Sequence, residues 1–286
     1  MSENSLPQPL AINDWLTDAT HQLVMAGIPS ARLDSELILG HTLRKSRSHL
    51  HAHPEEIMSD RDTEIANARL ALRLDRVPVA YIIGHKEFYG HQFYVTTATL
   101  IPRPESETLI ELLKKVVPRN ASLLPEKLRV VDVGTGSGSL GITAKLLFPE
   151  LDVALVDISR HALKVAEKNA KTLGADVTVI QSNLLSAYPF AATIIIANLP
   201  YVDPEWERSP ETNHEPSEAL FAGNNGKALI YELLIQTRDK LADGGSIILE
   251  ADPEQHDDII AEAKKYGLLL TDQEDYGLLF EKVANS

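Results

Sequence analysis

The segment VVDVGTGSG, residues 130–138, joins a run of β-branched residues to three closely spaced glycines. The apolar run predicts a buried strand that leads into Gly134. Gly134, Gly136 and Gly138 allow a sharp turn, and they let a ligand approach the main chain closely. We therefore expect an α/β sheet in which this strand is followed by a ligand-binding loop and a helix.

The chain around this segment alternates between strand-like and helix-like patterns. Further strands are expected at residues 152–156, 177–180, 193–197, 245–250 and 278–283. Helices are expected at residues 106–117, 160–173, 226–241 and 255–266. This alternation predicts a mostly parallel sheet with helices on both faces.

The first part of the chain has a different pattern. Residues 13–74 lack strand signals, and their apolar residues recur near a helical period, as Leu33, Leu37, Ile38, Leu43, Ile65, Leu70 and Leu72 do. This stretch has no catalytic constellation, so we expect it to serve in recognition. Three parts are predicted: a helical domain at 1–84, a β-hairpin linker at 85–104 and the α/β domain at 105–286.

The linker is predicted from two short segments. EFYGHQFYV, residues 87–95, has two aromatic-rich halves around Gly90 and His91, which is typical of a β-hairpin. In the following IPRPESE, residues 101–107, Pro102 and Pro104 stiffen an extended connection. We place the domain boundary there.

Composition excludes several classes of function. The net charge of −14 disfavours a nucleic-acid backbone as the principal partner. With no cysteine, the 286-residue chain has no disulfide, thiolate zinc site or Cys nucleophile. No apolar run reaches the roughly 20 residues of a membrane helix, and the start lacks a signal-peptide pattern. We expect a cytoplasmic protein that acts as a monomer and does not contact a membrane.

One basic cluster, RKSRSHLHAH at residues 44–53, stands out from the acidic background. Most such runs are simply solvated, although this one is also a candidate contact patch for a charged partner. Metal binding by His49, His51 and His53 is a weaker alternative. We expect no metal site.

The glycine loop is compatible with two cofactor classes, dinucleotides and S-adenosylmethionine. Asp157 follows the strand at 152–156, where an acid can accept hydrogen bonds from ribose hydroxyls. A dinucleotide motif that begins at Gly136 would start too late, because Gly134 already ends the strand. Read from Asp132, the pattern Asp-x-Gly-x-Gly-x-Gly includes all three glycines of the loop. It resembles the first motif of S-adenosylmethionine-dependent methyltransferases.

The fourth strand ends in Asn198-Leu199-Pro200-Tyr201. Planar amide nitrogen is a poor nucleophile, and acceptors aimed at its N–H groups favour the pyramidal transition state. The Asn198 side chain and the carbonyl of Leu199 can supply two such acceptors. Pro200 restrains the residue before it, and the Tyr201 ring can pack against a planar group. The tetrapeptide predicts methyl transfer to a planar nitrogen.

At this point the sequence resembles the HemK/PrmC family of protein-glutamine N5-methyltransferases. The resemblance covers nearly the whole chain, in ARLDSELILGHTLRKSR (31–47), VPVAYIIGHKEFYG (77–90), LIPRPESETLIE (100–111), VVDVGTGSG, ANLPYV and HEPSEALFAG (214–223). It implies a Rossmann-like methyltransferase domain with a mostly parallel seven-stranded sheet. It also implies methylation of the glutamine in the Gly-Gly-Gln motif of class I peptide chain release factors.

The resemblance further implies the site residues. Cofactor contacts would fall on Gly134, Thr135, Gly136, Ser137, Gly138, Asp157, Asn183, Leu184 and Asn198. The substrate glutamine would lie against Asn198, Leu199, Pro200 and Tyr201. Family members commonly carry Asp at position 183 and often an aromatic residue at position 184, so this chain departs from the pattern there.

Four alternatives stay open. A glutamine methyltransferase for a ribosomal protein is the nearest, and the N-terminal domain would separate it. An rRNA adenine N6-methyltransferase shares the Asn-Leu-Pro-Tyr pattern but needs a basic surface. A scaffold that binds the cofactor without catalysis would not need the intact tetrapeptide. A dehydrogenase is the most distant alternative.

Overall fold

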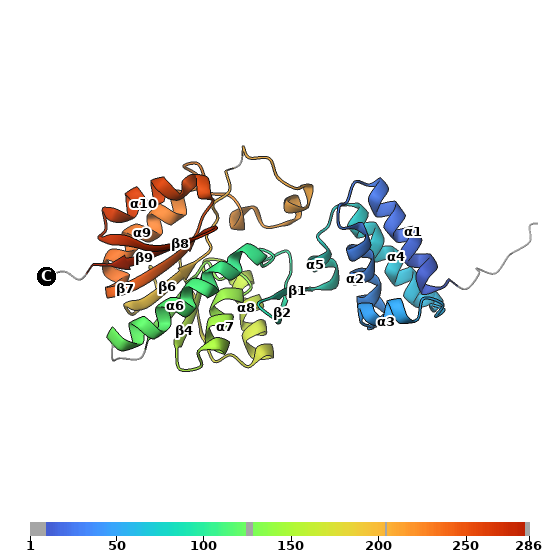
Figure 1. Ribbon diagram of the computed structural model, residues 1–286, viewed down its shortest axis with the longest axis horizontal. Coiled ribbons are helices and arrows are strands. Elements are labelled where there is room, and N and C mark those ends of the chain that lie inside the picture. Colours follow the sequence, from blue (N-terminus) through green and yellow to red (C-terminus); the bar gives the residue numbers. More distant parts are fainter. Residues whose placement is uncertain (1–9, 124–127, 204, 284–286) are drawn as a thin grey trace, which may run out of the picture. The chain divides into compact units, whose positions relative to one another are not determined.

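The computed structural model describes residues 10–123, 128–203 and 205–283 (Figure 1). The chain divides into two compact units. One unit comprises Met1–Gly84 together with Ser209–His214, and the other comprises His85–Arg208 and Glu215–Ser286. The domain boundaries drawn from the sequence stay predictions. The membership of Ser209–His214 in the first unit was not anticipated from the sequence.

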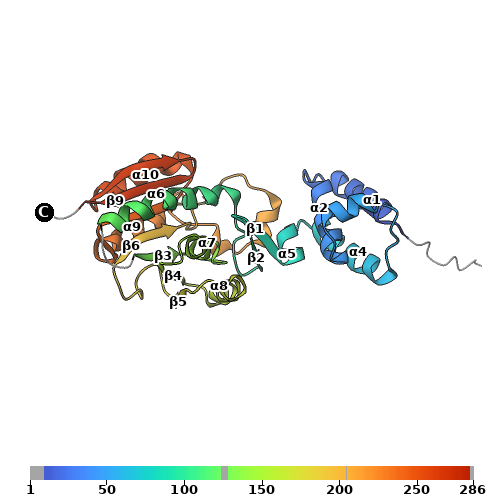
Figure 2. The same cartoon turned by 60° about the horizontal axis from the view of Figure 1, so that its bottom comes forward.

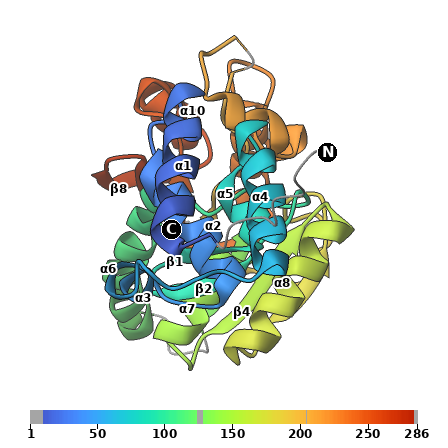
Figure 3. The same ribbon diagram turned by 90° about the vertical axis from the view of Figure 1, so that its right-hand side faces the viewer.

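The first unit is helical. Its helices are α1 (Ile12–Met25), α2 (Ala31–Leu43), α3 (Arg47–Ala52), α4 (Asp60–Leu74) and α5 (Val79–Ile83). Figure 3 shows α1 packed beside α2 and α4. Their shared core contains Trp15, Leu16, Leu23, Ile38, Leu39, Leu50 and Leu70.

The expected apolar period is only partly right for α2 and α4. Ile38 and Leu70 are buried, but Leu33 is 43% exposed and Leu72 is 47% exposed. Helix α2 instead buries Asp34, Ser35 and Glu36. Charged residues can be buried when they are paired, and here arginines supply the partners. Arg47 Nη2 lies 2.6 Å from Glu36 Oε2.

The segment Ser209–His214 is held in the first unit by buried charge pairs. Arg73 is 4% exposed, and its Nε donates to Asp34 Oδ2 at 2.7 Å while its Nη2 donates to Glu211 Oε1 at 2.9 Å. Arg76 Nη1 lies 3.3 Å from the same Glu211 oxygen. Because a buried guanidinium is costly without partners, Glu211 fixes this segment to α4.

The second unit is built on a seven-stranded sheet in the order β5-β4-β3-β6-β7-β9-β8. The strands are β3 (Arg129–Val133), β4 (Asp152–Asp157), β5 (Thr178–Gln181), β6 (Ala192–Ala197), β7 (Leu241–Glu250), β8 (Leu268–Glu274) and β9 (Gly277–Lys282). The pairs from β5 to β7 are parallel, whereas β9 is antiparallel to both its neighbours. The expected mostly parallel seven-stranded sheet is confirmed. Strand β8 was missed, because its burial pattern is mostly exposed.

Helices cover both faces of this sheet, as can be followed in Figures 1 and 2. One face packs against α6 (Glu107–Leu123), α7 (Ser139–Leu147) and α8 (Arg160–Leu173), and the other packs against α9 (Ala228–Lys240) and α10 (His256–Lys264). Neighbouring strand residues alternate between the two cores, as Val130 and Val131 do. The prediction that α6 ends at residue 117 is wrong, because the helix continues through Pro118.

The β-hairpin predicted from the aromatic pattern is present as β1 (His85–Phe88) and β2 (His91–Tyr94). Phe88 and Phe93 are buried and meet edge to face, with ring centroids 6.2 Å apart. Asn169 of α8 donates to the Tyr94 carbonyl at 2.9 Å and accepts from the Tyr94 N–H at 2.8 Å. The hairpin is therefore attached to the α/β unit.

The chain also contains short 3₁₀ helices, which are η1 (Pro104–Ser106), η2 (Pro210–His214), η3 (Ser217–Ala219) and η4 (Pro253–Gln255).

Candidate active site

The order in which successive strands are added to the sheet reverses between β3 and β6. The candidate site lies at this point. From β3 the chain runs outward through β4 and β5, and it then returns to pair β6 with the other edge of β3. Val133 is the partner of Ala197 in this register. Gly134 and Asn198 therefore leave the sheet side by side, at the kind of switch point where α/β proteins bind ligands.

A cavity of about 310 Å³ opens at this point. Its walls come from the glycine loop, the ends of β4 and β6, and the segments around residues 98–106 and 216–219. The predicted site residues that line it are Gly134, Thr135, Gly136, Ser137, Asp157, Asn183, Leu184, Asn198, Leu199 and Pro200. The structure thus brings together residues that lie up to 66 positions apart in the sequence, from Gly134 to Pro200.

The glycine loop is held by Asp132 at the end of β3. Its Oδ2 accepts from the Thr135 hydroxyl at 2.6 Å and from the Gly141 N–H at 2.8 Å. Burial raises the pKa of Asp132 to about 6. Gly134 has φ +71°, and a Cβ there would lie 2.9 Å from Leu199 Cδ2. The loop therefore requires glycine at this position both for its conformation and for its contact with the tetrapeptide.

Asp157 lies at the end of β4 and lines the cavity. Its Oδ2 accepts from the Gly136 N–H at 2.9 Å, and its Oδ1 accepts from the Ser159 N–H at 2.8 Å. Burial raises its pKa. Ser159 is the N-cap of α8, so Asp157 does not have that role. Each carboxylate oxygen has a further lone pair, so Asp157 can still accept from ligand hydroxyls.

Asn183 and Leu184 form the turn after β5, and both line the cavity. Leu184 is 7% exposed and has φ +48°, an uncommon conformation for a residue with a Cβ. The following N–H of Leu185 donates to Gln236 Oε1 of α9 at 2.8 Å. The hydrogen bond to α9 therefore holds the turn in place. The turn contributes the amide residue Asn183 and the apolar residue Leu184 to the cavity wall.

The tetrapeptide divides into two parts. Asn198, Leu199 and Pro200 line the cavity, and Asn198 Nδ2 donates to Ser106 Oγ at 2.8 Å. Tyr201 is not among the described residues that line it; its hydroxyl donates to Glu250 Oε1 at 2.9 Å. Burial and the neighbouring Glu250 carboxyl raise the pKa of Tyr201. The ring-stacking role predicted for Tyr201 stays a prediction, and the structure gives it a partner at the end of β7.

Several cavity residues were not singled out as site residues from the sequence. Glu215 is buried, accepts from the Ile101 N–H at 3.1 Å and pairs with Arg103. These contacts fasten the HEPSEA segment to the IPRPESE segment. Arg103, Ser106 and Glu218 all line the cavity as a result. The sequence indicated IPRPESE only as a connection and a motif of the resemblance, and HEPSEA only as a motif of the resemblance. Residues 112 positions apart must fold together before Arg103 meets Glu215.

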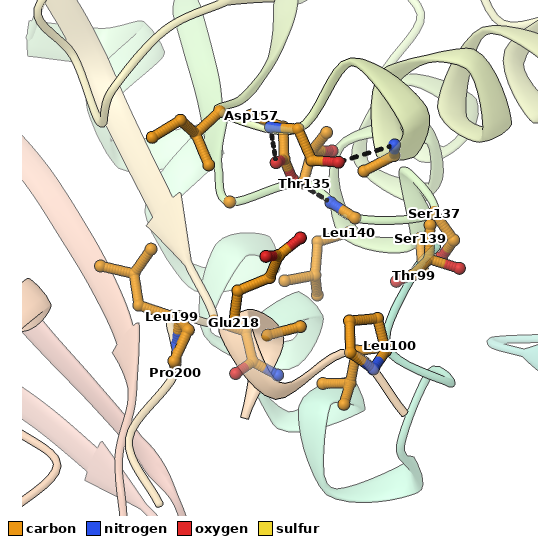
Figure 4. Close-up of a pocket in the computed structure, with 18 of the residues that line it drawn as sticks. Thr99, Leu100, Thr135, Ser137, Ser139, Leu140, Asp157, Leu199, Pro200 and Glu218 are labelled. Atoms are coloured by element: carbon orange, nitrogen blue, oxygen red, sulfur yellow. Dashed lines mark hydrogen bonds between the residues drawn. The ribbon is translucent and has the colours of Figure 1, made fainter. Parts of the chain in front are cut away.

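Figure 4 shows the cavity with Asp157 and Thr135 on one side and Leu199 and Pro200 on another. In this view the Glu218 carboxylate projects toward the space between them. The charge of Glu218 contributes to the raised pKa of Asp157. The cavity therefore contains two carboxylates and favours a ligand that carries positive charge.

The His residues of the basic cluster belong to the first unit, and none of them is among the described residues that line this cavity. His49 Nε2 lies 2.8 Å from Glu56 Oε2, and His51 Nε2 lies 3.3 Å from Glu36 Oε1. Over the described part of the chain, no group of three or more His, Asp or Glu side chains is arranged to hold a metal ion. In the same described residues, no helix has the length and apolar character needed to cross a membrane.

Comparison with known proteins finds family models that match parts of both units. A family model described as "PrmC N-terminal domain" matches residues 14–84, and one described as "Methyltransferase small domain" matches residues 106–215. The chain is 34% identical to a release factor glutamine methyltransferase of Deinococcus radiodurans, covering 90% of this chain and 92% of that protein. It is 34% identical to the protein of the same name from Coxiella burnetii, covering 93% and 95%.

Other relatives agree with these. The release factor glutamine methyltransferase of Escherichia coli is 32% identical, covering 82% of this chain and 84% of that protein. Among solved structures, a methyltransferase from Pyrococcus furiosus has a TM-score of 0.52 at 17% identity, covering 76% of this chain and 98% of that chain. At this identity the structural likeness concerns the fold alone.

Proposed function

Since the chain belongs to the release factor glutamine methyltransferase family, we propose that it transfers a methyl group from S-adenosylmethionine to the side-chain nitrogen of a glutamine in class I peptide chain release factors. The glutamine is that of the Gly-Gly-Gln motif. The protein is then an enzyme that modifies the translation machinery in the cytoplasm, and a ribosomal protein or rRNA is the alternative substrate to be tested.

The observation that carries this proposal is the pairing of β3 with β6. It brings the glycine loop at the end of β3 and Asn198 at the end of β6 to a single cavity, which Asp157 also lines. The part lined by Asp157 and Leu184 fits a nucleoside, because Asp157 can accept from ribose hydroxyls and Leu184 offers an apolar wall. The part lined by Asn198 fits a primary amide. When bound, S-adenosylmethionine supplies a methyl group on a positively charged sulfur that leaves as a neutral thioether.

The residues of this chain act by orienting the acceptor nitrogen. Asn198 Oδ1 and the carbonyl oxygen of Leu199 accept the two N–H groups of the substrate amide. These hydrogen bonds favour the pyramidal nitrogen, and they stabilise the positive charge that develops as the C–N bond forms and the C–S bond breaks. One amide proton is then lost to solvent. Transfer of this kind needs no metal ligand and no covalent enzyme intermediate.

The test is incubation with labelled S-adenosylmethionine and three separate substrates: a class I release factor, a ribosomal-protein fraction and rRNA. We expect label in the release factor, at the glutamine side chain, and none when that glutamine is replaced by glutamate. Label only in a ribosomal protein would establish the alternative protein substrate. Label only in rRNA would overturn the proposed function.

We further propose that the helical unit recognises the release factor. Arg47 is already paired with Glu36, so within the basic cluster we assign the contact with a partner's acidic groups to Arg44 and Lys45. We expect Arg44→Glu/Lys45→Glu to slow association with release factor, more strongly at low salt, and to leave S-adenosylmethionine affinity unchanged. Stopped-flow association rates would measure this, with Arg61→Glu on α4 as the control. Equal rates for both variants would contradict this recognition surface.

The Leu199→Pro variant restores the commoner double-proline form of the tetrapeptide. Because the acceptor at position 199 is a main-chain carbonyl, we expect kcat to stay within about tenfold of wild type, a barrier change near 1.4 kcal/mol. Leu199→Ala is the matched control. It removes the side chain that contacts Gly134 but adds no proline ring at position 199, so the backbone there keeps only the restraint from Pro200. A loss above a hundredfold in Leu199→Pro with normal folding would contradict a backbone acceptor.

Glu218 is expected to distinguish the cofactor from its product by charge. S-adenosylmethionine carries one positive charge more than S-adenosylhomocysteine, and Glu218 is an exposed carboxylate in the cavity wall. We expect Glu218→Gln to weaken S-adenosylmethionine binding ~3–10-fold and product binding less than about twofold, with the difference shrinking at high salt. Calorimetry with both ligands measures this, and Glu207→Gln serves as a surface control. Equal losses for the two ligands would contradict a charge effect.

A further inference from the structure

We propose that Ser106 and Glu250 are positioning residues that hold the Asn198 amide with its NH₂ group turned inward and its carbonyl oxygen free for the substrate. The inference rests on the proposed function, because it explains how Asn198 comes to be an acceptor. It starts from the orientation of the side-chain amide, which Asn198 cannot fix by itself. A side-chain amide can be turned by 180°, and the reversed amide would aim a donor at the substrate N–H.

The first observation is the contact of Asn198 with Ser106. Asn198 Nδ2 and Ser106 Oγ are 2.8 Å apart, and both residues line the cavity. Ser106 is 3% exposed, and its own N–H donates to the Arg103 carbonyl at 3.1 Å. It lies where η1 passes into α6, so its hydroxyl has a fixed place beside the reacting end of Asn198.

This contact does not fix the amide on its own. A serine hydroxyl can donate or accept, so it satisfies either orientation of an asparagine. The orientation is decided by what lies on the other side of the hydroxyl. If an obligatory acceptor takes the Ser106 proton, Ser106 must accept from Asn198, and only the NH₂ group can donate.

The second observation is that Glu250 supplies such an acceptor. It is 1% exposed at the end of β7, the strand next to β6. Its Oε1 accepts from the Tyr201 hydroxyl at 2.9 Å. Its Oε2 is buried and has no hydrogen-bond partner among the described residues. We assign it as the acceptor for the hydroxyl of Ser106, whose hydrogen bonding lowers the pKa of Glu250. Burial raises the pKa of Glu250, and hydrogen bonding from Ser106, Tyr201 and Asn198 opposes the rise.

Together these contacts form one chain of donors that ends at Glu250. Asn198 donates to Ser106 and Tyr201 donates to Glu250. In the proposed arrangement the Ser106 hydroxyl turns its proton toward the same carboxylate. When Glu250 is ionised its carboxylate accepts only, and in that form the direction of every bond in the chain is set. The Asn198 carbonyl oxygen is then left over, at the cavity wall. Tyr201 thereby belongs to the support of the site, and it is not among the described residues that line the cavity.

Kinetics with release factor provide the first test. We expect Ser106→Ala to lower kcat ~5–20-fold, the range that one side-chain hydrogen bond supports, with little change in the KM for S-adenosylmethionine. Ser106→Thr keeps the hydroxyl and should recover most of the loss, and Glu250→Gln should lower kcat similarly. Thr237→Ala removes a buried hydroxyl in α9 and controls for a general effect of such a loss.

A double substitution tells whether Ser106 acts through Asn198. In an Asn198→Ala background there is no amide to orient, so Ser106→Ala should cause no further loss of kcat. If Ser106→Ala costs the same factor in both backgrounds, the positioning role is wrong. The same holds if Ser106→Thr is as slow as Ser106→Ala while both fold normally.

A second readout does not depend on the substrate. The side-chain ¹⁵N–¹H₂ signal of Asn198 is identified by its absence in Asn198→Asp. We expect its exchange with solvent to be slow in the wild-type protein and at least tenfold faster in Ser106→Ala. Equal exchange in the two proteins would overturn the inference even if release factor is methylated. Conversely, if release factor is not methylated, this measurement still decides the orientation of Asn198.

Discussion

We expect Asn198→Ala to transfer methyl groups to release factor ~10²–10³-fold more slowly than the wild-type enzyme, as is typical when one preorganised group at a reacting centre is removed. The loss should appear in kcat, because the interaction strengthens as the nitrogen becomes pyramidal. Single-turnover assays with saturating S-adenosylmethionine measure it directly. Cofactor affinity should fall less than kcat, since the glycine loop and Asp157 are untouched and Asn198 is only one of the expected cofactor contacts.

The matched variant for this prediction is Asn198→Asp. It keeps an oxygen that can accept the substrate N–H but loses the NH₂ group that donates to Ser106. We expect its rate to lie between those of the wild type and Asn198→Ala. If Asn198→Ala retained nearly full single-turnover activity on the release factor glutamine, the catalytic assignment would be wrong even with the fold and the cofactor right.

Much of the fold could be predicted because its signals are local. The apolar runs and the helical periods of the second unit depend on neighbouring residues, so the predicted strands and α8 agree with the structure. The position of the site followed from the same patterns. Once β3 and β6 are parallel neighbours, Gly134 and Asn198 must emerge at the same edge of the sheet.

The parts that could not be predicted depend on contacts between distant residues. Glu211 meets Arg73 across 138 positions of sequence, so nothing local indicates that Ser209–His214 belongs with the helical unit. The exposure of Leu33 was not predicted for the same reason. Helix α2 turns Asp34 and Glu36 inward, where they meet arginines from elsewhere in the chain. Charge pairing over long separations overrode the hydrophobic pattern there.

The candidate site shows the same division. The residue types of the tetrapeptide indicate acceptors for a planar nitrogen, and this can be inferred without coordinates. Which atom of Asn198 faces the substrate depends on Ser106, 92 positions away. That Tyr201 bonds Glu250 depends on the neighbouring strand β7. Sequence patterns thus indicate the groups that react, whereas their orientation is set by the packing of the sheet.

The second large effect is expected at the cofactor end of the cavity, in Asp157→Ala. Hydrogen bonds to a charged group contribute about 1.5–3 kcal/mol each, and this variant loses one or two of them to the ribose. It also removes the acceptor for the Gly136 N–H, which loosens the glycine loop. We therefore expect the Kd for S-adenosylmethionine to rise ~10²-fold or more, measured by calorimetry with both cofactor and product.

Asp157→Asn separates these two contributions. It keeps an oxygen that can accept from Gly136 but lacks the charge, so we expect a smaller loss of affinity than in Asp157→Ala. Because the ribose is common to S-adenosylmethionine and its product, Asp157→Ala should weaken the binding of both ligands strongly, whereas Glu218→Gln should weaken product binding less than about twofold. Unchanged affinity in a folded Asp157→Ala protein would mean that another acid binds the ribose. A preference for NAD over S-adenosylmethionine in the wild type would contradict the cofactor assignment itself.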